Sequence, residues 1–389
     1  MKQILSISGY LAVKEIWRNR GRFLLVSLVI ALITLLVLFI AALGEGLGNG
    51  NREYISKLDA ELIVYQAKSD YLIQASRLGR DRLAAIRRVD GVADAGMFGT
   101  ANATLLLSGD NPTLKVALLG VEPGHVGEPP AVQGSQLSTD LAKEVIIDRN
   151  TALRSNLTIG DTLTMRVTQG TKDEFFDLRV VGITDGRQYS LQPSIFVPFF
   201  TWDRIRPKSE AEVNASNPIA NVVLVKLTDP DQIEEVAGRL TAQVNNIETA
   251  TLNTAIQALP GYSAQQSTLN TQGGFTLFIG VLVIGGFFQI QILQKVAQIG
   301  VLKAIGTANP VVAAASIIQI MIITVIGVAI GGLLSYLFSL TFPPTVPIVF
   351  NGATSALAVV ALLLIGPLGG LVSIRYAVRI EPLKALGLS

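Results

Sequence analysis

Few residues in this chain could carry out chemistry. The chain has a single histidine, His125, and no cysteine. His125 stands in a segment rich in proline and glycine, VEPGHVGEPP. We expect a solvated loop side chain there, because catalytic and metal sites surround a histidine with partner residues. Without cysteine, the chain can form neither disulfides nor thiolate metal sites.

The sequence also lacks the motifs that mark common catalytic sites. It contains no G-x-x-x-x-G-K-[ST] loop to hold the phosphates of ATP. It contains no G-x-S-x-G nucleophile turn and no H-E-x-x-H zinc motif. We therefore predict that the chain is not an enzyme, has no catalytic or metal-binding residue and carries no cofactor of its own.

A short segment between two long apolar stretches is the most informative part of the sequence. Ile299, Leu302 and Ile305 are spaced so that they share one stripe of a helix. Such a helix at a membrane surface could bind a soluble partner protein, or it could lie on the membrane without one. The pattern alone fits both. The candidate docking residues are Gln298, Ile299, Gly300, Val301, Leu302, Lys303, Ala304, Ile305 and Gly306.

Four apolar segments flank and position this candidate helix. Only 15% of the residues are charged, against about 25% in an ordinary soluble domain. The deficit is local, because residues 249–294 and 304–374 contain no charged residue at all. A helix needs about 20 apolar residues to cross a bilayer. We predict transmembrane helices over residues 23–43, 275–293, 311–338 and 353–374.

The first apolar segment is predicted to be an uncleaved anchor. It is too long for the apolar part of a signal peptide, and no clear A-x-A cleavage site follows it. The spans contain no ionisable residue other than tyrosine, such as Tyr336. Because proton and ion relays need intramembrane carboxylates or histidines, a proton-driven carrier is disfavoured, and any energy must come from another protein.

Basic residues predict the orientation of the spans. They gather before the first span, between the second and third, and after the fourth. Since cytoplasmic segments carry the excess of lysine and arginine, both termini should face the cytoplasm of a multi-pass cell (inner) membrane protein. The predicted cytoplasmic parts are an amphipathic helix over residues 1–22, a coupling helix over 294–310 and the tail 375–389. The predicted outer parts are residues 44–274 and the short loop 339–352.

Residues 44–274 are predicted to form an α+β domain and a stalk. We expect a small mixed core with an inserted β-rich lobe, with turns at Gly109-Asp110 and at Ile159-Gly160-Asp161. Residues 253–274 fit either a stalk helix that continues into the membrane or a loose linker, with a break at Pro260-Gly261. Strands are predicted at 61–66, 104–107, 115–119, 162–167, 178–183 and 222–227, and helices at 81–88 and 229–244.

The third span contains a G-x-x-x-G motif formed by Gly327 and Gly331. Two small residues one turn apart let another helix approach closely. The motif is a possible contact between chains, but ordinary packing within the chain is the favoured interpretation.

Several short motifs resemble those of the FtsX/MacB-like permeases of ABC transporters, also called type VII. The segment from Gln298 to Gly306 is similar to the family's E-I-G-x-L-[KR]-A-[IL]-G element, with glutamine in place of the usual glutamate. The C-terminal AVRIEPLKAL resembles the A-x-R-I-x-P-x-x-A-L ending, and the N-terminal LAVKEIWRNR resembles the basic amphipathic helix. The outer segment IGDTL resembles G-D-x-[LV]. The order of one span, a large domain and three spans is also the family's.

The resemblance implies a permease that works with a separate ABC-type ATPase subunit, which binds ATP and Mg²⁺. It implies a homodimer, or a heterodimer with a second permease, in which motion of the coupling helix is transmitted to the outer domain (mechanotransmission). The glutamine at position 298 implies that a charged contact with the ATPase is missing or replaced. Further expected partners are membrane lipid and a membrane-fusion or other outer protein, but no nucleic acid.

Three functions stay open for such a chain. The first is export or extraction of a lipid, lipoprotein, peptide or hydrophobic compound. The others are regulation of a cell-wall hydrolase through the outer domain and signalling as a sensor.

Overall fold

The computed structural model describes residues 2–107, 113–209, 218–342 and 348–379. The predicted turn at Gly109-Asp110, part of the loop 339–352 and the chain from residue 380 onward lie outside the described residues. The chain divides into two compact units. We call residues 1–46 and 266–389 the membrane unit, and residues 47–265 the outer unit.

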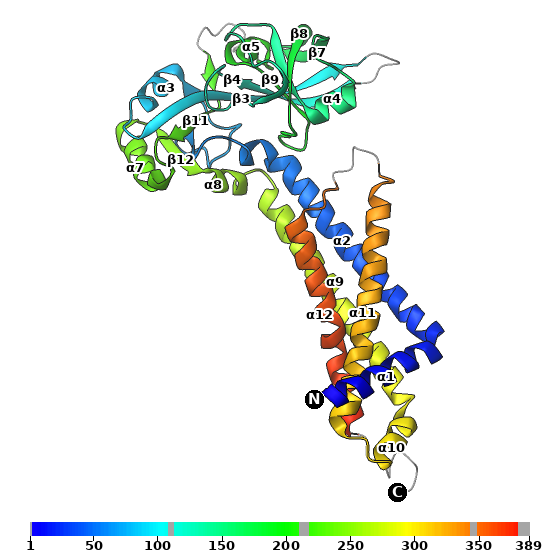
Figure 1. Ribbon diagram of the computed structural model, residues 1–389. Coiled ribbons are helices and arrows are strands. Elements are labelled where there is room, and N and C mark those ends of the chain that lie inside the picture. The colour runs from blue at the N-terminus through cyan, green and yellow to red at the C-terminus, as the bar shows by residue number, and fades with distance from the viewer. Residues whose placement is uncertain (1, 108–112, 210–217, 343–347, 380–389) are drawn as a thin grey trace. The chain divides into compact units, whose positions relative to one another are not determined.

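Four long helices form the membrane unit, which confirms the predicted number of membrane helices (Figure 1). Each of them is long and apolar enough to cross a bilayer. A fifth helix, α1 (Lys2–Arg18), packs against α11, and α10 (Val296–Ala304) joins α9 to α11. The four are α2 (Arg20–Ser56), α9 (Tyr262–Leu293), α11 (Asn309–Ser339) and α12 (Gly352–Arg379).

Two of the four helices extend well beyond the predicted apolar spans. Helix α2 continues without interruption to Ser56, and α9 already begins at Tyr262. The residue before α9 is Gly261, whose φ of +76° is a conformation that glycine adopts without strain. The structure therefore makes residues 262–274 helical and places the break at the predicted Pro260-Gly261.

Glycines allow the membrane helices to pack closely. A Cβ atom on Gly369 of α12 would lie 2.7 Å from the carbonyl oxygen of Val281 on α9. Gly327 and Gly331 of α11 likewise allow α11 to approach α2 closely. A Cβ on Gly327 would lie 2.6 Å from the Cβ of Ile30, and one on Gly331 would lie 2.5 Å from a backbone oxygen of α2. The G-x-x-x-G motif thus packs within the chain.

The outer unit is built on one mixed sheet. Its strands run in the order β12-β1-β11-β3-β4-β9-β6-β8-β5, and β7 pairs with β3 and β8. Most neighbours are antiparallel, but β4 with β9 and β6 with β8 are parallel. The strands are β1 (Leu62–Gln66), β3 (Val92–Leu106), β4 (Thr113–Val121), β5 (Ala131–Gly134), β6 (Glu144–Asp148), β7 (Thr162–Gln169), β8 (Lys172–Thr184), β9 (Ser194–Pro198), β11 (Val222–Leu227) and β12 (Ile247–Thr251). A second small sheet pairs β2 (Leu78–Gly79) with β10 (Ile219–Ala220).

Both faces of the sheet are buried at β1, which explains why its first four residues are all apolar. Leu62 and Val64 pack with α3 and α7, whereas Ile63 and Tyr65 pack with the end of α2 and with α8. A strand covered on both faces needs apolar residues at every position. The helices of the outer unit are α3 (Arg80–Ile86), α4 (Arg149–Ser155), α5 (Phe199–Ile205), α7 (Ile233–Gln243) and α8 (Leu252–Gln257), with a 3-10 turn η1 (Pro230–Gln232) before α7.

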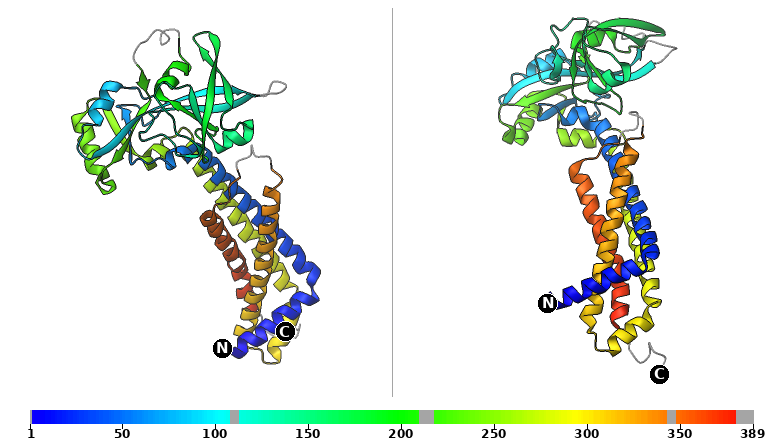
Figure 2. Two further views of the ribbon diagram at one scale, coloured as in Figure 1. Left: turned by 45° about the horizontal axis from the view of Figure 1, so that its top comes forward. Right: turned by 45° about the vertical axis from the view of Figure 1, so that its right-hand side comes forward.

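The prediction of an α+β domain with an inserted β-rich lobe is confirmed. Strands β5 to β9 are inserted along the chain between β4 and β11, and they extend the same sheet from β4 (Figure 2). The predictions had no counterpart for β2, β5, β6, β9, β10 and β12, all of them five residues long or shorter.

Candidate functional site

The candidate site is the turn that joins α9 to α11, which we call the α10 turn (residues 294–308). Helix α9 ends at Leu293, and α10 follows over Val296–Ala304. Helix α11 begins at Asn309 with a proline in its first turn, the position at which proline is tolerated because its missing N–H has no helical partner.

A backbone motif ends α10 and explains the glycine at position 306. Gly306 has a φ of +99°, which glycine adopts without strain. The N–H of Thr307 donates to the carbonyl of Leu302 at 3.0 Å, and the N–H of Gly306 donates to the carbonyl of Lys303 at 3.0 Å. This pair of bonds is a Schellman motif. Ile305 therefore caps α10 rather than extending it.

Polar contacts tie the α10 turn to its neighbours. Lys295 forms an ion pair with Glu15 of α1, and its Nζ lies 5.5 Å from the ring centroid of Phe23 on α2. At the other end, the Nζ of Lys303 donates to the carbonyl of Val378 on α12 at 2.8 Å. The turn is thus held to α1, α2 and α12.

Apolar packing fixes the rotation of α10. Ile299 is only 9% exposed and packs with Ile292, Val312 and Ala377. Gly300 is also buried. A displacement of α10 would therefore act on α9, α11 and α12, because Ile299 shares one apolar cluster with residues of all three.

The predicted stripe of Ile299, Leu302 and Ile305 is not one exposed surface. Ile299 is buried, Leu302 is half-buried and Ile305 is exposed. The physical reason is that the buried side of α10 is chosen by the neighbouring helices, which the spacing within α10 does not reveal. Within α10 and its C-cap residue Ile305, the exposed residues are Ala297, Gln298, Val301, Ala304 and Ile305, and we call them the exposed face. Val301 is 47% exposed and Ile305 is 76% exposed. The docking role of residues 298–306 stays a prediction.

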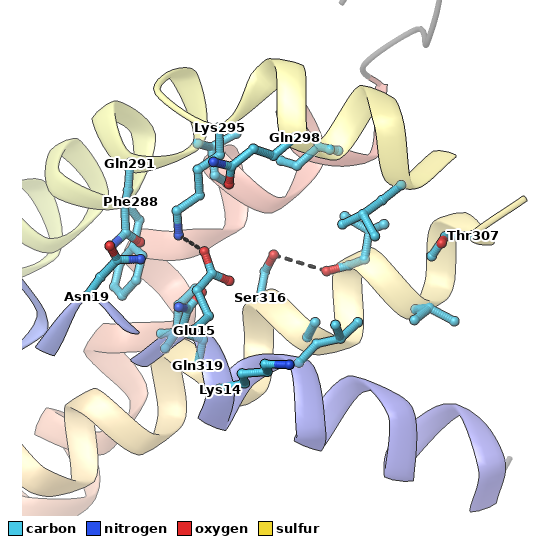
Figure 3. Close-up of a pocket in the computed structure, with 18 of the residues that line it drawn as sticks. Lys14, Glu15, Asn19, Phe288, Gln291, Lys295, Gln298, Thr307, Ser316 and Gln319 are labelled. Carbon is cyan, nitrogen blue, oxygen red and sulfur yellow. Dashed lines mark hydrogen bonds and ion pairs between the residues drawn. The ribbon is translucent and has the colours of Figure 1, made fainter. Parts of the chain in front are cut away.

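A groove of about 380 Å³ lies behind α10, between α1, α9, α10 and α11 (Figure 3). Its apolar wall includes Phe288, Leu302 and Ile320, and its polar wall includes Lys14 and Gln319. The Glu15–Lys295 ion pair crosses the space in Figure 3. Sequence reasoning missed this groove, because it forms only where α1, from the start of the chain, packs beside the consecutive helices α9, α10 and α11.

Within the outer unit, the end of α2 is embedded in the protein core. Tyr54 is fully buried and stacks on Phe98 with ring centroids 5.1 Å apart, and its hydroxyl donates to the carbonyl of Gly127 at 2.9 Å. Arg52 donates to the hydroxyl of Tyr262 at 3.0 Å. These contacts anchor the last turns of α2 in the domain and join them to the first turn of α9.

His125 is paired rather than free. Its Nδ1 lies 2.8 Å from the carboxylate of Asp94, which also accepts a hydrogen bond from the N–H of Val126 at 2.8 Å. Burial acts to raise the pKa of Asp94, but these hydrogen bonds outweigh it and leave the pKa below its ordinary value. Among the residues that the structure describes, no group of three or more metal-ligating side chains occurs, here or elsewhere.

Two family models match this chain. The model of the MacB-like periplasmic core domain matches residues 23–243, and the model of the FtsX-like permease C-terminal region matches residues 271–382. The chain is 25% identical over 377 residues to the putative hemin transport system permease protein HrtB of Staphylococcus haemolyticus, covering 97% of this chain and 99% of that protein. The HrtB protein of Staphylococcus epidermidis matches to the same extent.

Solved structures also align with the chain, at low similarity. The extracellular domain of the ABC-type transporter YknZ from Gram-positive bacteria aligns with a TM-score of 0.35 and 13% identity, over 49% of this chain and 98% of that one. The periplasmic region of MacB from Actinobacillus actinomycetemcomitans aligns with a TM-score of 0.36 and 12% identity, over 54% and 94%.

Proposed function

Because this chain belongs to the FtsX/MacB-like family of ABC transporter permeases, we propose that it couples ATP hydrolysis by a separate ATPase to movements of its outer unit and thereby exports a hydrophobic compound. The ATPase subunit binds ATP and Mg²⁺. The permease works as a homodimer or as a heterodimer with a second permease, with the α10 turn and both termini in the cytoplasm.

The observation that carries this proposal is the exposed face of the α10 turn. Val301 and Ile305 present apolar surface outside the apolar spans, on a turn whose opposite side is buried against other helices. A partner that covers these side chains gains about 25 cal/mol for each Å² of apolar surface removed from water. A push on this face moves α9, α11 and α12 through Ile299.

Two continuous helices provide a route from the membrane unit to the outer unit. Helices α2 and α9 both run from the membrane unit into the outer unit without a break. Inside the outer unit, the contacts of Arg52 and Tyr54 fix the end of α2 to Tyr262 and to the sheet. Motion along these helices is therefore transmitted to a packed core rather than to a loose linker.

The relatives favour a hydrophobic, anionic substrate such as hemin. The two staphylococcal proteins that carry the name of hemin transport permeases match this chain over nearly its whole length. No observation of comparable weight favours regulation of a hydrolase or sensing. Hemin is thus the first compound to test.

The docking proposal is tested with Val301→Asp. Burying the introduced carboxylate in the contact with the ATPase, without a charged or hydrogen-bonding partner, costs several kcal/mol. The loss of apolar burial adds about 1 kcal/mol, since half of the valine side chain is available to a partner. We expect binding of the cognate ATPase to weaken more than about 100-fold, measured by co-purification and by surface plasmon resonance on the detergent-solubilised chain.

Val132→Asp is the matched control. Val132 lies on β5 of the outer unit and is 66% exposed. In the proposed orientation this site lies across the membrane from the ATPase, so the same chemical change is made away from the docking contact. This variant should bind the ATPase like the parent chain. If Val301→Asp and Ile305→Asp both bind the ATPase with unchanged affinity, the exposed face is not the docking site.

The substrate proposal is tested in membrane vesicles that contain the chain and its cognate ATPase. Hemin should stimulate ATP hydrolysis and leave the vesicle membrane in an ATP-dependent manner. The Val301→Asp variant should lose both effects, whereas Val132→Asp should keep them. A complex that hydrolyses ATP and couples normally but does not respond to hemin exports another compound.

A further inference from the structure

The groove behind α10 combines apolar walls with unpaired polar groups. We propose that it binds the headgroup of an anionic phospholipid from the membrane leaflet at the basic end of the membrane unit. This inference relies on the proposed orientation only for the identity of that leaflet. The ATPase is not part of the site, because the groove and the exposed face lie on different sides of α10 and share only Gln298.

The first observation is a pair of buried amides in the groove wall. Gln291 of α9 is 4% exposed and Gln319 of α11 is 6% exposed, and both line the groove (Figure 3). The amide nitrogen of each has no hydrogen-bond partner among the described residues. Because nearly all buried polar groups in proteins are paired, two unpaired donors in one groove indicate a ligand with hydrogen-bond acceptors, such as phosphate or ester oxygens.

The second observation is the charge of the groove. Glu15 and Lys295 neutralise each other in an ion pair. Arg18 lines the groove, is exposed and has no side-chain partner among the described residues. Lys14 also lines the groove, and among the described residues its Nζ contacts only the neutral side chain of Tyr10, with the hydroxyl at 3.2 Å and the ring centroid at 5.3 Å. Two positive charges therefore remain without a counter-charge, which favours an anionic ligand.

The third observation identifies the ligand as a lipid rather than a free anion. The groove walls include the apolar side chains of Phe288, Ile320 and Val312, which belong to helices long enough to span a bilayer. An acyl chain can continue along these helices while the headgroup stays near Lys14 and Arg18. Basic pockets between membrane helices are known to suit anionic headgroups for this reason.

A lipid in this position would contact the α10 turn directly. Leu302 and Ile299 of α10 belong to the groove wall, together with residues of α1, α9 and α11. The lipid would therefore hold α1 against the turn from the side opposite the exposed face. Leu302, which the sequence analysis placed in the ATPase contact, is in this proposal a lipid contact.

The test uses the purified full-length chain in detergent, without the ATPase, so its failure is distinguishable from failure of the docking proposal. Native mass spectrometry measures binding of dioleoylphosphatidylglycerol, of the neutral dioleoylphosphatidylcholine and of glycerol 3-phosphate. We expect one phosphatidylglycerol molecule to bind at least ten times more tightly than either of the other two compounds, because only it has both the charge and the acyl chains.

Variants locate the site. Since each basic side chain strengthens attraction to anionic lipid about fivefold, Lys14→Gln combined with Arg18→Gln should weaken phosphatidylglycerol binding about 25-fold. Gln319→Leu, which removes a buried amide at similar volume, should also weaken it. Arg20→Gln is the matched control, because Arg20 is exposed near the groove but does not line it, and its effect should be below twofold.

Three outcomes would overturn the proposal. Equal binding of phosphatidylglycerol and phosphatidylcholine would show that charge is not recognised. Equal binding of glycerol 3-phosphate would show a simple anion site. A loss in Arg20→Gln as large as that in the double variant would show diffuse attraction to a basic surface rather than a built groove.

Discussion

Two adjacent glycines in α9 allow a sharp test of how the membrane helices pack. A Cβ atom on Gly285 would lie 2.7 Å from the carbonyl oxygen of Gly369 on α12, whereas a Cβ on Gly286 would have no atom within 4 Å. Real Cβ atoms do not approach other atoms as closely as the first of these distances. Because the atom in the way belongs to the backbone, it cannot rotate aside, and α9 and α12 must separate.

The magnitude follows from comparing Gly285→Ala with Gly286→Ala. Both variants gain the same helix propensity, about 1 kcal/mol, so the difference between them isolates the clash. Overpacking of this kind costs about 1–3 kcal/mol. For the membrane unit this corresponds to a difference in melting temperature of about 2–12 °C, with Gly285→Ala the less stable variant.

The assay is thermal unfolding of the two purified variants in the same detergent, followed by circular dichroism of the helices. Gly369→Ala provides an independent second variant, since its Cβ would lie 2.7 Å from the carbonyl oxygen of Val281 on the other side of the same contact. Equal melting temperatures for Gly285→Ala and Gly286→Ala would refute the close packing of α9 on α12.

Two further predictions concern orientation and pH. The chain has no cysteine, so a single introduced cysteine is the only thiol that can react. Thr171→Cys in the outer unit should react with an impermeant thiol reagent on intact cells, and Asn309→Cys at the start of α11 should react only after lysis. The reverse pattern would overturn the proposed orientation. The pKa of Asp94 is lowered in the folded state, so its contribution to stability is present above the ordinary aspartate value of about 3.9 and is lost as the pH falls through the lowered value. The urea concentration at the midpoint of unfolding of the parent chain should therefore fall as the pH drops below about 4. Asp94→Asn should lose part of that pH dependence. Identical pH profiles for the two proteins would show that the pair with His125 does not stabilise the outer unit.

The sequence alone was sufficient to predict the membrane helices, because crossing a bilayer is decided locally. Long uncharged stretches such as residues 304–374 need hydrocarbon around them whatever else the chain does. Several elements of the outer unit were predicted for a similar reason. The strand at Val222–Leu227 and the helix after Asp229 follow from a continuous apolar run and from a cap with a proline and acidic residues.

The short strands β6 and β9 were not predictable in the same way. Ile146 and Ile147 of β6 pair with Phe196 and Ile195 of β9, and these partners are about fifty residues away along the chain. A segment with only three consecutive apolar residues becomes a strand only when a neighbouring strand supplies hydrogen bonds to its backbone groups. That neighbour is chosen by the fold of the whole domain.

In the candidate site, too, some features depend on the local sequence and others on tertiary packing. The sequence by itself determined that a short helix within residues 294–310 joins two membrane helices, since this depends on local polarity and hydrophobic spacing. Its bounds, Val296–Ala304, and its end at Gly306 were found only in the structure. Only the tertiary structure decided which side of that helix is exposed, because the contacts of Ile299 with α9, α11 and α12 fix its rotation. The groove with its unpaired Gln291 and Gln319 likewise exists only once helices distant in the sequence are packed together, because burial is a property of the assembled helices and not of any one segment.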